Sequence, residues 1–176
     1  MHIRRHFTVE GHSPYQGIPF KNAASEIRQP DGSIVFSQTD IEAPQDWSQV
    51  ACDVLAQKYF RKAGVPKNLK PVPEEGVPEF LWRKQAKDGA KETTGERSAK
   101  QVFDRLAGTW TYWGWKGGYF DGENDARAFY DELCHMLASQ KCAPTRRNGS
   151  TPACIGPMAS MVPAKAITMS ITKADG

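Results

Sequence analysis

The sequence predicts a mainly α-helical domain that carries a short N-terminal β-hairpin, which is an α+β arrangement. Three stretches repeat apolar residues at the i, i+3, i+4 spacing of a helix, and each follows a capping residue. Near the N-terminus, a Pro-Asp-Gly tripeptide separates two β-prone runs. The chain has 176 residues, of which 39% are hydrophobic and 24% charged, a balance that favours one globular domain.

The predicted hairpin joins residues 25–28 to residues 33–37 through a turn at residues 30–32. Proline, aspartate and glycine each favour tight turns, by fixing φ, by bonding the local backbone and by allowing positive φ. Because side chains alternate along a strand, Val35 should lie on the face opposite to its two neighbours. Residues 3–10 alternate weakly and predict one further short strand.

The first predicted helix begins near Asp46, a good N-cap residue, with Gln49 as its capping-box partner. Helical spacing then predicts one buried face. That face comprises Val50, Ala51, Val54, Leu55, Lys58 and Tyr59. The helix should end where residues 61–62, both basic, precede Gly64 and Pro66, since such residues are typical of a helix C-terminus.

Residues 66–97 predict a surface connection. The stretch contains four prolines, followed by a charged run with two glycines. One short helix is expected around residues 79–84, with Leu81 and Trp82 anchoring it to the body of the domain.

The second predicted helix begins at Ser98, with Gln101 as its capping-box partner. Its buried side consists of Val102, Phe103, Leu106 and Ala107. An aromatic-rich turn at residues 109–120 should lead to a third helix, which Asp121 caps and which ends near residues 139–141. The third helix has an apolar stripe of Ala126, Phe129, Tyr130, Leu133, Met136 and Leu137.

The aromatic stretch has two interpretations. Seven of the chain's 18 aromatic residues fall within residues 101–120. They could pack the junction of two helices, with three glycines making the turn, or they could form a stacking platform for bases. A stacking platform normally accompanies a basic groove, and Lys116 is the only charged residue between Arg105 and Asp121. The packing interpretation is therefore favoured.

The charge distribution argues against direct binding of DNA or RNA. The net charge is +3, but residues 1–144 hold 19 Lys plus Arg and 19 Asp plus Glu. The whole basic excess belongs to residues 145–176, so the body of the chain lacks the electrostatic footprint of a phosphate-backbone binder. No apolar run is long enough to span a bilayer, and no secretory signal is evident, so we expect a cytoplasmic protein without membrane contact.

The sequence contains no evident active site. Its four cysteines and four histidines are scattered, without the C-x-x-C or H-E-x-x-H spacing of metal sites. Residues 114–118, Gly-Trp-Lys-Gly-Gly, lack the spacing of a phosphate-binding loop. We therefore assign no catalytic, substrate-binding or metal-binding residues, and the cofactor-binding residues stay unknown.

Several long blocks resemble the N-terminal region of bacterial adenosylcobalamin-dependent, or class II, ribonucleotide reductases. The shorter blocks are R-H-F-T at 5–8, S-P-Y at 13–15, A-S-E-I-R at 24–28, P-D-G-S at 30–33 and W-S-Q-V-A at 47–51. The longer blocks occupy residues 53–66, 98–120 and 125–133. Together they extend over nearly all of residues 1–144, and ordered blocks of this length are far more specific than a short motif.

The resemblance implies reduction of ribonucleotides, as a ribonucleoside-diphosphate reductase, for DNA precursor synthesis. In the full enzyme, adenosylcobalamin supplies a radical to a catalytic cysteine in a ten-stranded α/β barrel downstream of this domain. The implied partners are that barrel, the ribonucleotide substrate and nucleotide effectors. None of the four cysteines of this chain matches the catalytic motifs, so we expect an N-terminal fragment that is inactive alone and binds no cobalamin.

The resemblance breaks off after Pro144. Residues 145–176 contain no Phe, Trp, Tyr or Glu and show no lasting helix or strand period, which is typical of a disordered segment. If one base is added at Thr145, the tail can be reread as a family-like string that begins N-S-P-Q-W-F-N-T-G-L-H-W-A-Y-G. The codons of Met158, Met161 and Met169 leave no choice of third base, and they yield the required glycine, glycine and valine.

We therefore expect two regions, a reductase N-terminal domain at residues 1–144 and an out-of-frame or disordered tail at residues 145–176. A genuine alternative C-terminus is the competing explanation of the tail. For function, the alternative is a stand-alone helical module that binds a nucleotide or a protein through its aromatic residues.

Overall fold

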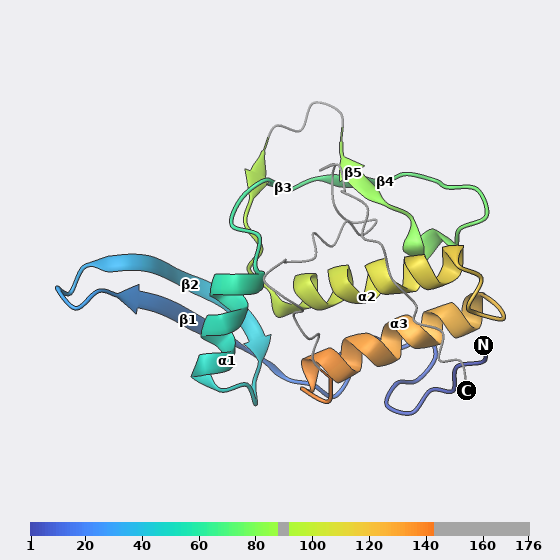
Figure 1. The fold of residues 1–176 in the computed structure, drawn as a ribbon, viewed down its shortest axis with the longest axis horizontal. Coiled ribbons are helices and arrows are strands. Elements are labelled where there is room, and N and C mark those ends of the chain that lie inside the picture. The colour runs from blue at the N-terminus through green and yellow to red at the C-terminus, as the bar shows by residue number, and fades with distance from the viewer. Residues whose placement is uncertain (88–91, 143–176) are drawn as a thin grey trace, which may run out of the picture.

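Two long antiparallel helices form the centre of the domain. The computed structural model describes residues 1–87 and 92–142, and in these residues α2 (Ala99–Lys116) and α3 (Glu123–Ala138) lie side by side (Figure 1). A short connection after Lys116 reverses the chain, so α3 runs back along α2. The predicted second and third helices are thereby confirmed.

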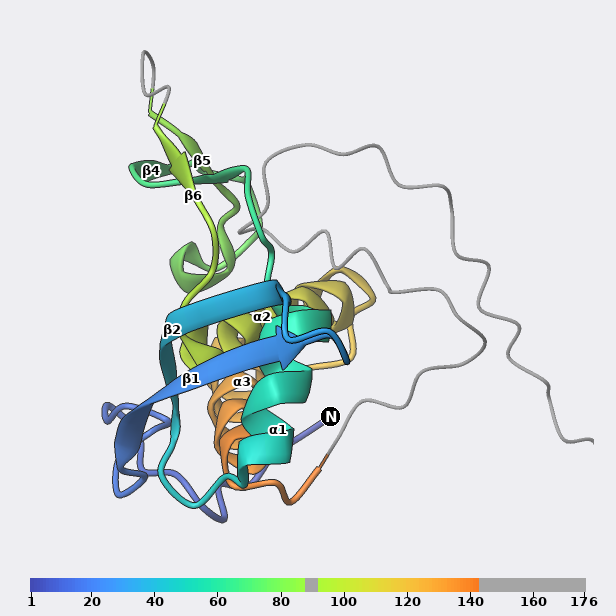
Figure 2. The ribbon, with the colours of Figure 1, turned by 90° about the vertical axis from the view of Figure 1, so that its left-hand side faces the viewer.

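A β-hairpin arm and a short helix lie at one end of this helix pair. The arm consists of β1 (Phe20–Arg28) and β2 (Ile34–Pro44), which pair antiparallel. The helix α1 (Gln49–Val54) packs against β1, and Figures 1 and 2 show the hairpin projecting past it, away from α2 and α3. The fold is a small α+β domain, as predicted.

The predicted surface connection contains more order than the sequence indicated. Its short helix exists as a 3-10 turn, η2 (Glu79–Leu81), and Leu81 is buried as expected. Two small antiparallel pairs flank it: β3 (Val65–Pro66) with β6 (Thr93–Thr94), and β4 (Leu69–Pro71) with β5 (Lys84–Ala86). Strands of two or three residues have no periodicity to read, so only the folded chain could reveal them.

The hairpin is confirmed but is much longer than predicted. Its turn lies where the tripeptide at residues 30–32 placed it, and Gly32 has a φ of 87°, a value that favours glycine. Pairing continues inward as far as Phe20 opposite Pro44, with two irregularities of register along the way. The inner half lacked a strand signal because charged residues such as Lys21, Asp40 and Glu42 interrupt it, whereas packing of Ile41 in the core holds it in place.

The predicted start and end of the first helix were wrong. Ser48, not Asp46, is the N-cap, and its hydroxyl accepts a hydrogen bond from the N–H of Ala51. A tight turn in which the N–H of Trp47 bonds the carbonyl of Pro44 delays the helix start. After Val54 the helix widens into a π-turn, η1 (Leu55–Tyr59), and ends with Phe60 in extended backbone, before the basic and glycine signals are reached.

The second helix has the predicted capping box, since the Ser98 and Gln101 side chains each bond the other's backbone. The predicted turn at residues 109–120 was wrong in position, because α2 continues through Gly114 to Lys116. The turn is confined to the residues that follow, and Gly118 has a φ of 67°. Helical hydrogen bonding therefore outweighs the low helix propensity of the aromatic residues.

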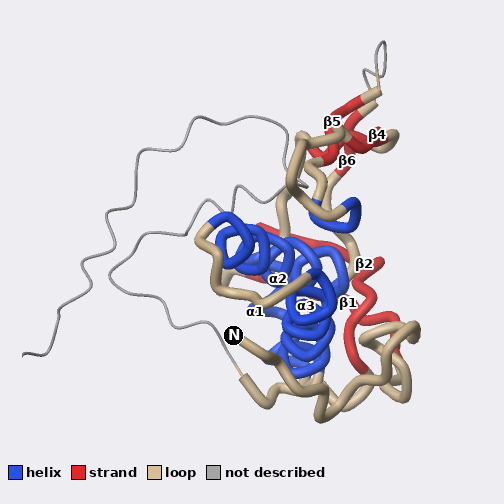
Figure 3. The backbone as a smooth tube through the Cα atoms, turned by 90° about the vertical axis from the view of Figure 1, so that its right-hand side faces the viewer, coloured by secondary structure: helices blue, strands red, loops and turns tan. Residues whose placement is uncertain are grey.

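Two N-terminal predictions were also wrong. Residues 3–10 form no strand, and the N–H groups of Ile3, Phe7 and Thr8 bond to carboxylates of α3 instead. Asp121 does not cap α3, whose N-cap is Gly122. Asp121 instead forms an ion pair with the N-terminal amino group of Met1. Figure 3 shows the N-terminal segment running beside α3.

One hydrophobic core joins all the larger elements. It draws Ile41 and Ala43 from β2, Cys52 and Leu55 from α1 and η1, and larger sets from the two long helices. Those sets are Ala99, Val102, Phe103, Leu106 and Ala107 from α2, and Leu133, Cys134, Leu137 and Ala138 from α3. The predicted buried sides of the second and third helices are largely confirmed.

Within residues 1–87 and 92–142, no helix has both the length and the apolar character to cross a membrane. The predicted tail at residues 145–176 lies outside the described residues.

Candidate functional site

The titratable side chains of the described residues form no metal centre. No group of three or more His, Cys, Asp or Glu side chains there could hold a metal ion. Burial raises the pKa of the thiols of Cys52, Cys134 and Cys142. A thiol that stays protonated is a poor nucleophile, so these three cysteines serve as small packing residues.

Two histidines hold the N-terminal segment onto α3. A ring nitrogen of His135 lies 3.1 Å from the carbonyl oxygen of Pro14, and its ring stacks on Phe7 at 5.3 Å. A ring nitrogen of His2 lies 2.8 Å from a carboxylate oxygen of Asp125. Neither histidine is paired with a nucleophilic side chain in these contacts, so they have a positional role.

Three acidic residues of α3 bind the backbone and side chains of residues 1–8, here called the N-terminal strap. Glu132 accepts hydrogen bonds from the N–H of Phe7 at 3.0 Å, the N–H of Thr8 at 2.8 Å and the Thr8 hydroxyl at 2.7 Å. Burial acts to raise the pKa of Glu132, but these hydrogen bonds outweigh it and hold the pKa below its usual value. The buried Asp131 pairs with Arg5 at 2.7 Å. Asp125, the third, binds the N–H of Ile3.

A buried polar cluster centres on Asp104 of α2. One of its carboxylate oxygens accepts hydrogen bonds from the hydroxyls of Tyr15 at 2.5 Å and Tyr130 at 3.0 Å, with the Cys134 sulfur at 3.7 Å. Burial raises the pKa of Asp104 and of both tyrosines. The cluster ties the N-terminal loop to both long helices, and every side chain in it has a partner. It therefore stabilises the fold rather than offering a reactive group.

The aromatic end of α2 is mostly a packed junction. The Tyr112 hydroxyl lies 2.9 Å from a Glu74 carboxylate oxygen, and the Trp115 indole donates to the carbonyl of Gly76 at 2.7 Å. These contacts support the packing interpretation. Two aromatic rings are not packed in this junction, since Trp113 is 46% and Tyr119 58% exposed.

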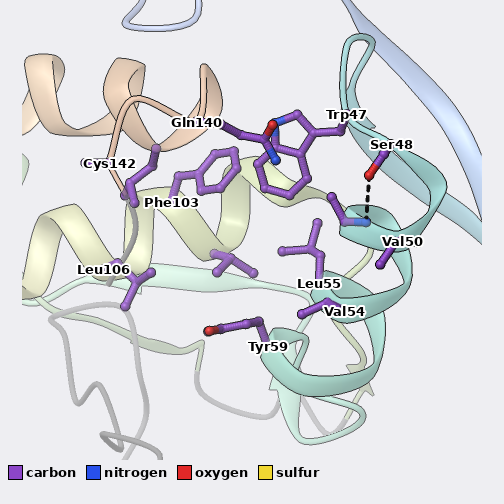
Figure 4. A pocket seen from close by; sticks show the side chains of 13 residues that line it. Trp47, Ser48, Val50, Val54, Leu55, Tyr59, Phe103, Leu106, Gln140 and Cys142 are labelled. Atoms are coloured by element: carbon purple, nitrogen blue, oxygen red, sulfur yellow. Dashed lines mark hydrogen bonds between the residues drawn. The ribbon is translucent and has the colours of Figure 1, made fainter. Parts of the chain in front are cut away.

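An apolar hollow lies where α1, α2 and the end of α3 meet, and we call it the α1 groove (Figure 4). It has a volume of about 400 Å³. Its lining consists of Trp47, Ser48, Val50, Ala51, Val54, Leu55, Tyr59, Val102, Phe103, Leu106, Leu137, Gln140 and Cys142. Nine of these thirteen side chains have no oxygen or nitrogen atom, so the groove suits an apolar occupant.

Sequence reasoning placed two residues of this groove incorrectly. Val50 and Val54 were predicted to lie on the buried face of the first helix, but they are 70% and 45% exposed. The face of α1 and η1 that enters the core consists of Cys52, Leu55 and Ala56. The sequence predicted the apolar stripe of the first helix, but it did not show that this stripe is wider than the face that the core buries.

Comparison with known families gives the decisive observation. The family described as "Class II vitamin B12-dependent ribonucleotide reductase" has an N-terminal profile that matches residues 21–140. The chain belongs to this family. This stretch includes β1 from its second residue and every later element of the described residues, and the N-terminal strap, the loop after it and Phe20 precede the match.

Individual reductases agree with the family match. The chain is 60% identical over 151 residues to the vitamin B12-dependent ribonucleotide reductases of Bradyrhizobium diazoefficiens and of Agrobacterium fabrum, with 82% of this chain covered. It is 31% identical over 131 residues to the corresponding enzyme of Rhodopirellula baltica, with 74% of this chain covered. The chain spans 10% to 12% of the length of these relatives.

Proposed function

We propose that this chain is the N-terminal domain of an adenosylcobalamin-dependent ribonucleoside-diphosphate reductase and that it has no reductase activity alone. The observation that carries the proposal is the 60% identity to two such enzymes, of which the chain spans 12%. In the whole enzyme, the domain would pack against a ten-stranded α/β barrel that supplies the catalytic cysteines and binds ribonucleotides and effectors. Deoxyribonucleotide supply for DNA synthesis would place it in the cytoplasm.

The described residues do not fit cobalamin itself. The α1 groove, at about 400 Å³, is of the size that holds a small organic molecule, whereas a corrin ring with its nucleotide tail is much larger. Histidine is a residue type that can bind cobalt, but one ring nitrogen is already hydrogen-bonded within the domain in His2, His12 and His135. We therefore assign the cofactor to the rest of the enzyme and derive no chemical step from this domain.

We further propose that a one-base frameshift near residue 145 separates the domain from its barrel. The basic charge, the missing aromatic residues and the family-like alternative reading all begin at that point of the sequence. Resequencing the locus tests this directly. The expected result is a reading frame that continues the reductase after residue 144, and downstream DNA that never resumes the reductase would contradict it.

An activity measurement tests the rest of the proposal. The purified 176-residue chain is incubated with adenosylcobalamin, a dithiol reductant and a ribonucleoside diphosphate or triphosphate. We expect no deoxyribonucleotide from this chain, and formation of product by the same gene with its frame restored. Deoxyribonucleotide formed by the 176-residue chain would refute inactivity.

A stand-alone binding module remains the second candidate, supported by the exposed rings of Trp113 and Tyr119. Base stacking requires exposed rings of this kind. Calorimetric titration with dATP, dTTP and ribonucleotides tests it. Saturable binding that Trp113→Ala abolishes would favour the module over the fragment.

A further inference from the structure

The helix α1 presents more apolar surface than the core of the domain uses. Val50 and Val54 stand four residues apart, which places them on one face of the helix, and both are largely exposed. Cys52 and Leu55, on the side toward α2, are buried. An exposed pair of valines at the rim of an apolar hollow is typical of a surface that another segment covers.

The opposite wall of the α1 groove is also apolar. Phe103 and Leu106 come from α2, and Figure 4 shows them across the hollow from Val54 and Leu55. The aromatic ring of Trp47 closes one end. Apolar side chains therefore line both walls of the groove, and covering them would be favourable.

Two polar groups in the wall already have partners within the domain. The Ser48 hydroxyl accepts the bond that caps α1, and the Trp47 indole donates to the carbonyl oxygen of Ala138 at 2.9 Å. These two groups would therefore offer an occupant little hydrogen bonding. Aromatic or large aliphatic side chains match this lining best.

The last described residues of the chain lie at this groove. Cys142, the last described residue, is part of the lining, and Gln140, the last residue of the family match, lies beside it. The relatives are far longer than this chain, which spans 12% of them. In such an enzyme, whatever follows the domain starts at the mouth of the groove and is present there at a local concentration of about millimolar or above.

We propose that the α1 groove is the docking site for the segment that directly follows this domain in the intact reductase, held by aromatic side chains. The inference rests on the proposed function. In the alternative reading of the tail, Trp and Phe are the fifth and sixth residues after Pro144. Seven extended residues reach about 24 Å, so a Trp at that point can return to the groove beside Cys142. Residues 145–176 in the present frame contain no aromatic residue that could do so.

A binding experiment with a peptide tests the proposal. The probe is a fluorescently labelled peptide, N-S-P-Q-W-F-N-T-G-L-H-W-A-Y-G, titrated with the full 176-residue chain. We expect saturable binding that weakens about tenfold or more with Val50→Glu, since a carboxylate at the rim opposes apolar burial. A peptide with Ala in place of its Trp-Phe pair should bind as poorly.

Matched controls separate docking from general effects. Val35 at the hairpin tip is 59% exposed, so Val35→Glu adds the same charge at a similarly exposed valine outside the groove. It should change the affinity less than about twofold. Circular dichroism and the melting temperature should match the parent for both variants, because neither valine is in the core. A second control peptide comprises residues 145–176 of the present chain, and it should not bind.

Several outcomes would overturn the proposal. They are an absence of saturation at about 1 mM peptide, equal losses from Val50→Glu and Val35→Glu, or equal binding of the 145–176 peptide. Dimerisation of the chain that Val50→Glu abolishes would assign the groove to a second copy instead. If the peptide does not bind but the downstream DNA encodes the reductase, docking is refuted and the proposed function stands. If the downstream DNA encodes no reductase, the proposed function is refuted.

Discussion

The buried ion pair between Glu96 and Arg105 should contribute far more to stability than the exposed ion pair next to it in the sequence. One Glu96 carboxylate oxygen lies 3.1 Å from Nε of Arg105, and the other lies 3.0 Å from an Nη of Arg105 and 2.8 Å from the N–H of Arg61. The two paired side chains are only 5% and 11% exposed. This pair therefore anchors the connection before α2 to the end of η1.

The change to test is Glu96→Gln. The substitution keeps the shape of the side chain but leaves the buried Arg105 guanidinium without its counter-charge. Removing one partner of a buried pair typically costs about 3–5 kcal/mol. Since domains of this kind unfold with about 5–15 kcal/mol, the variant should lose a large part of its stability.

The matched control is Asp40→Asn, which breaks the ion pair between Asp40 and Arg97 at 2.7 Å. Those side chains are 69% and 63% exposed, so water screens the pair, and its loss should cost about 0–1 kcal/mol. Arg97 directly precedes the N-cap of α2 and Arg105 lies within the helix, and the two ion pairs differ strongly in burial.

Urea unfolding followed by tryptophan fluorescence measures both changes. With a slope of about 1.5 kcal/mol/M, the midpoint should fall by about 2 M or more for Glu96→Gln and by less than about 1 M for Asp40→Asn. A double variant, Glu96→Leu with Arg105→Met, should recover much of the loss because it removes both charges. Equal shifts for the two single variants would refute the reasoning from burial.

Three further outcomes are expected. A Cβ at Gly114 would lie 2.7 Å from the Phe120 ring, so Gly114→Ala should cost about 1–3 kcal/mol in urea unfolding. A Cβ at Gly108 would lie 3.9 Å from its nearest neighbour, an atom of the Tyr130 ring, so Gly108→Ala should raise stability by about 0.5–1 kcal/mol. A loss of stability there would contradict this account. Because the pKa of Glu132 is lowered, its stabilising effect is present above the usual value of 4.5 and lost as pH falls through the lower folded value. The protection factors of the strap amides, which correct for slower intrinsic exchange at low pH, should therefore fall below about pH 4.5, and Glu132→Gln should remove that pH dependence. Gln140 follows the C-cap of α3 and has a φ of 55°, so Gln140→Gly should raise stability by about 1 kcal/mol, and an unchanged urea midpoint would count against that reason.

Local signals predicted the parts of the fold that depend on neighbouring residues. The capping box at Ser98 satisfies backbone groups within one turn, and it appears in the structure as predicted. The turn of the hairpin depends on the conformational freedom of Gly32 and was also placed correctly. The same reasoning failed at Asp46 and Asp121. Asp46 lies in the turn that the Trp47 N–H and the Pro44 carbonyl close, and Asp121 pairs with the N-terminal amino group of Met1, which is distant in the chain.

The α1 groove could not be predicted from the sequence, because the spacing of apolar residues does not show which of them the core covers. A helical pattern shows that Val50 and Val54 share one side of α1, but not whether the core extends beneath them. The π-turn at Leu55–Tyr59 and the short length of α1 determine which residues enter the core. The exposure of this rim was therefore visible only once α1 had been placed against α2.

The sequence by itself determined the α+β class, the order of the main helices, the hairpin and the family, because these depend on local propensity and on long ordered blocks of residues. Only the tertiary structure decided that the acidic face of α3 holds the N-terminal strap rather than a metal, and that the apolar stripe of α1 is wider than the core. Both follow from contacts between segments far apart in the chain, such as Thr8 with Glu132 at 2.8 Å, and such contacts leave no period in the sequence.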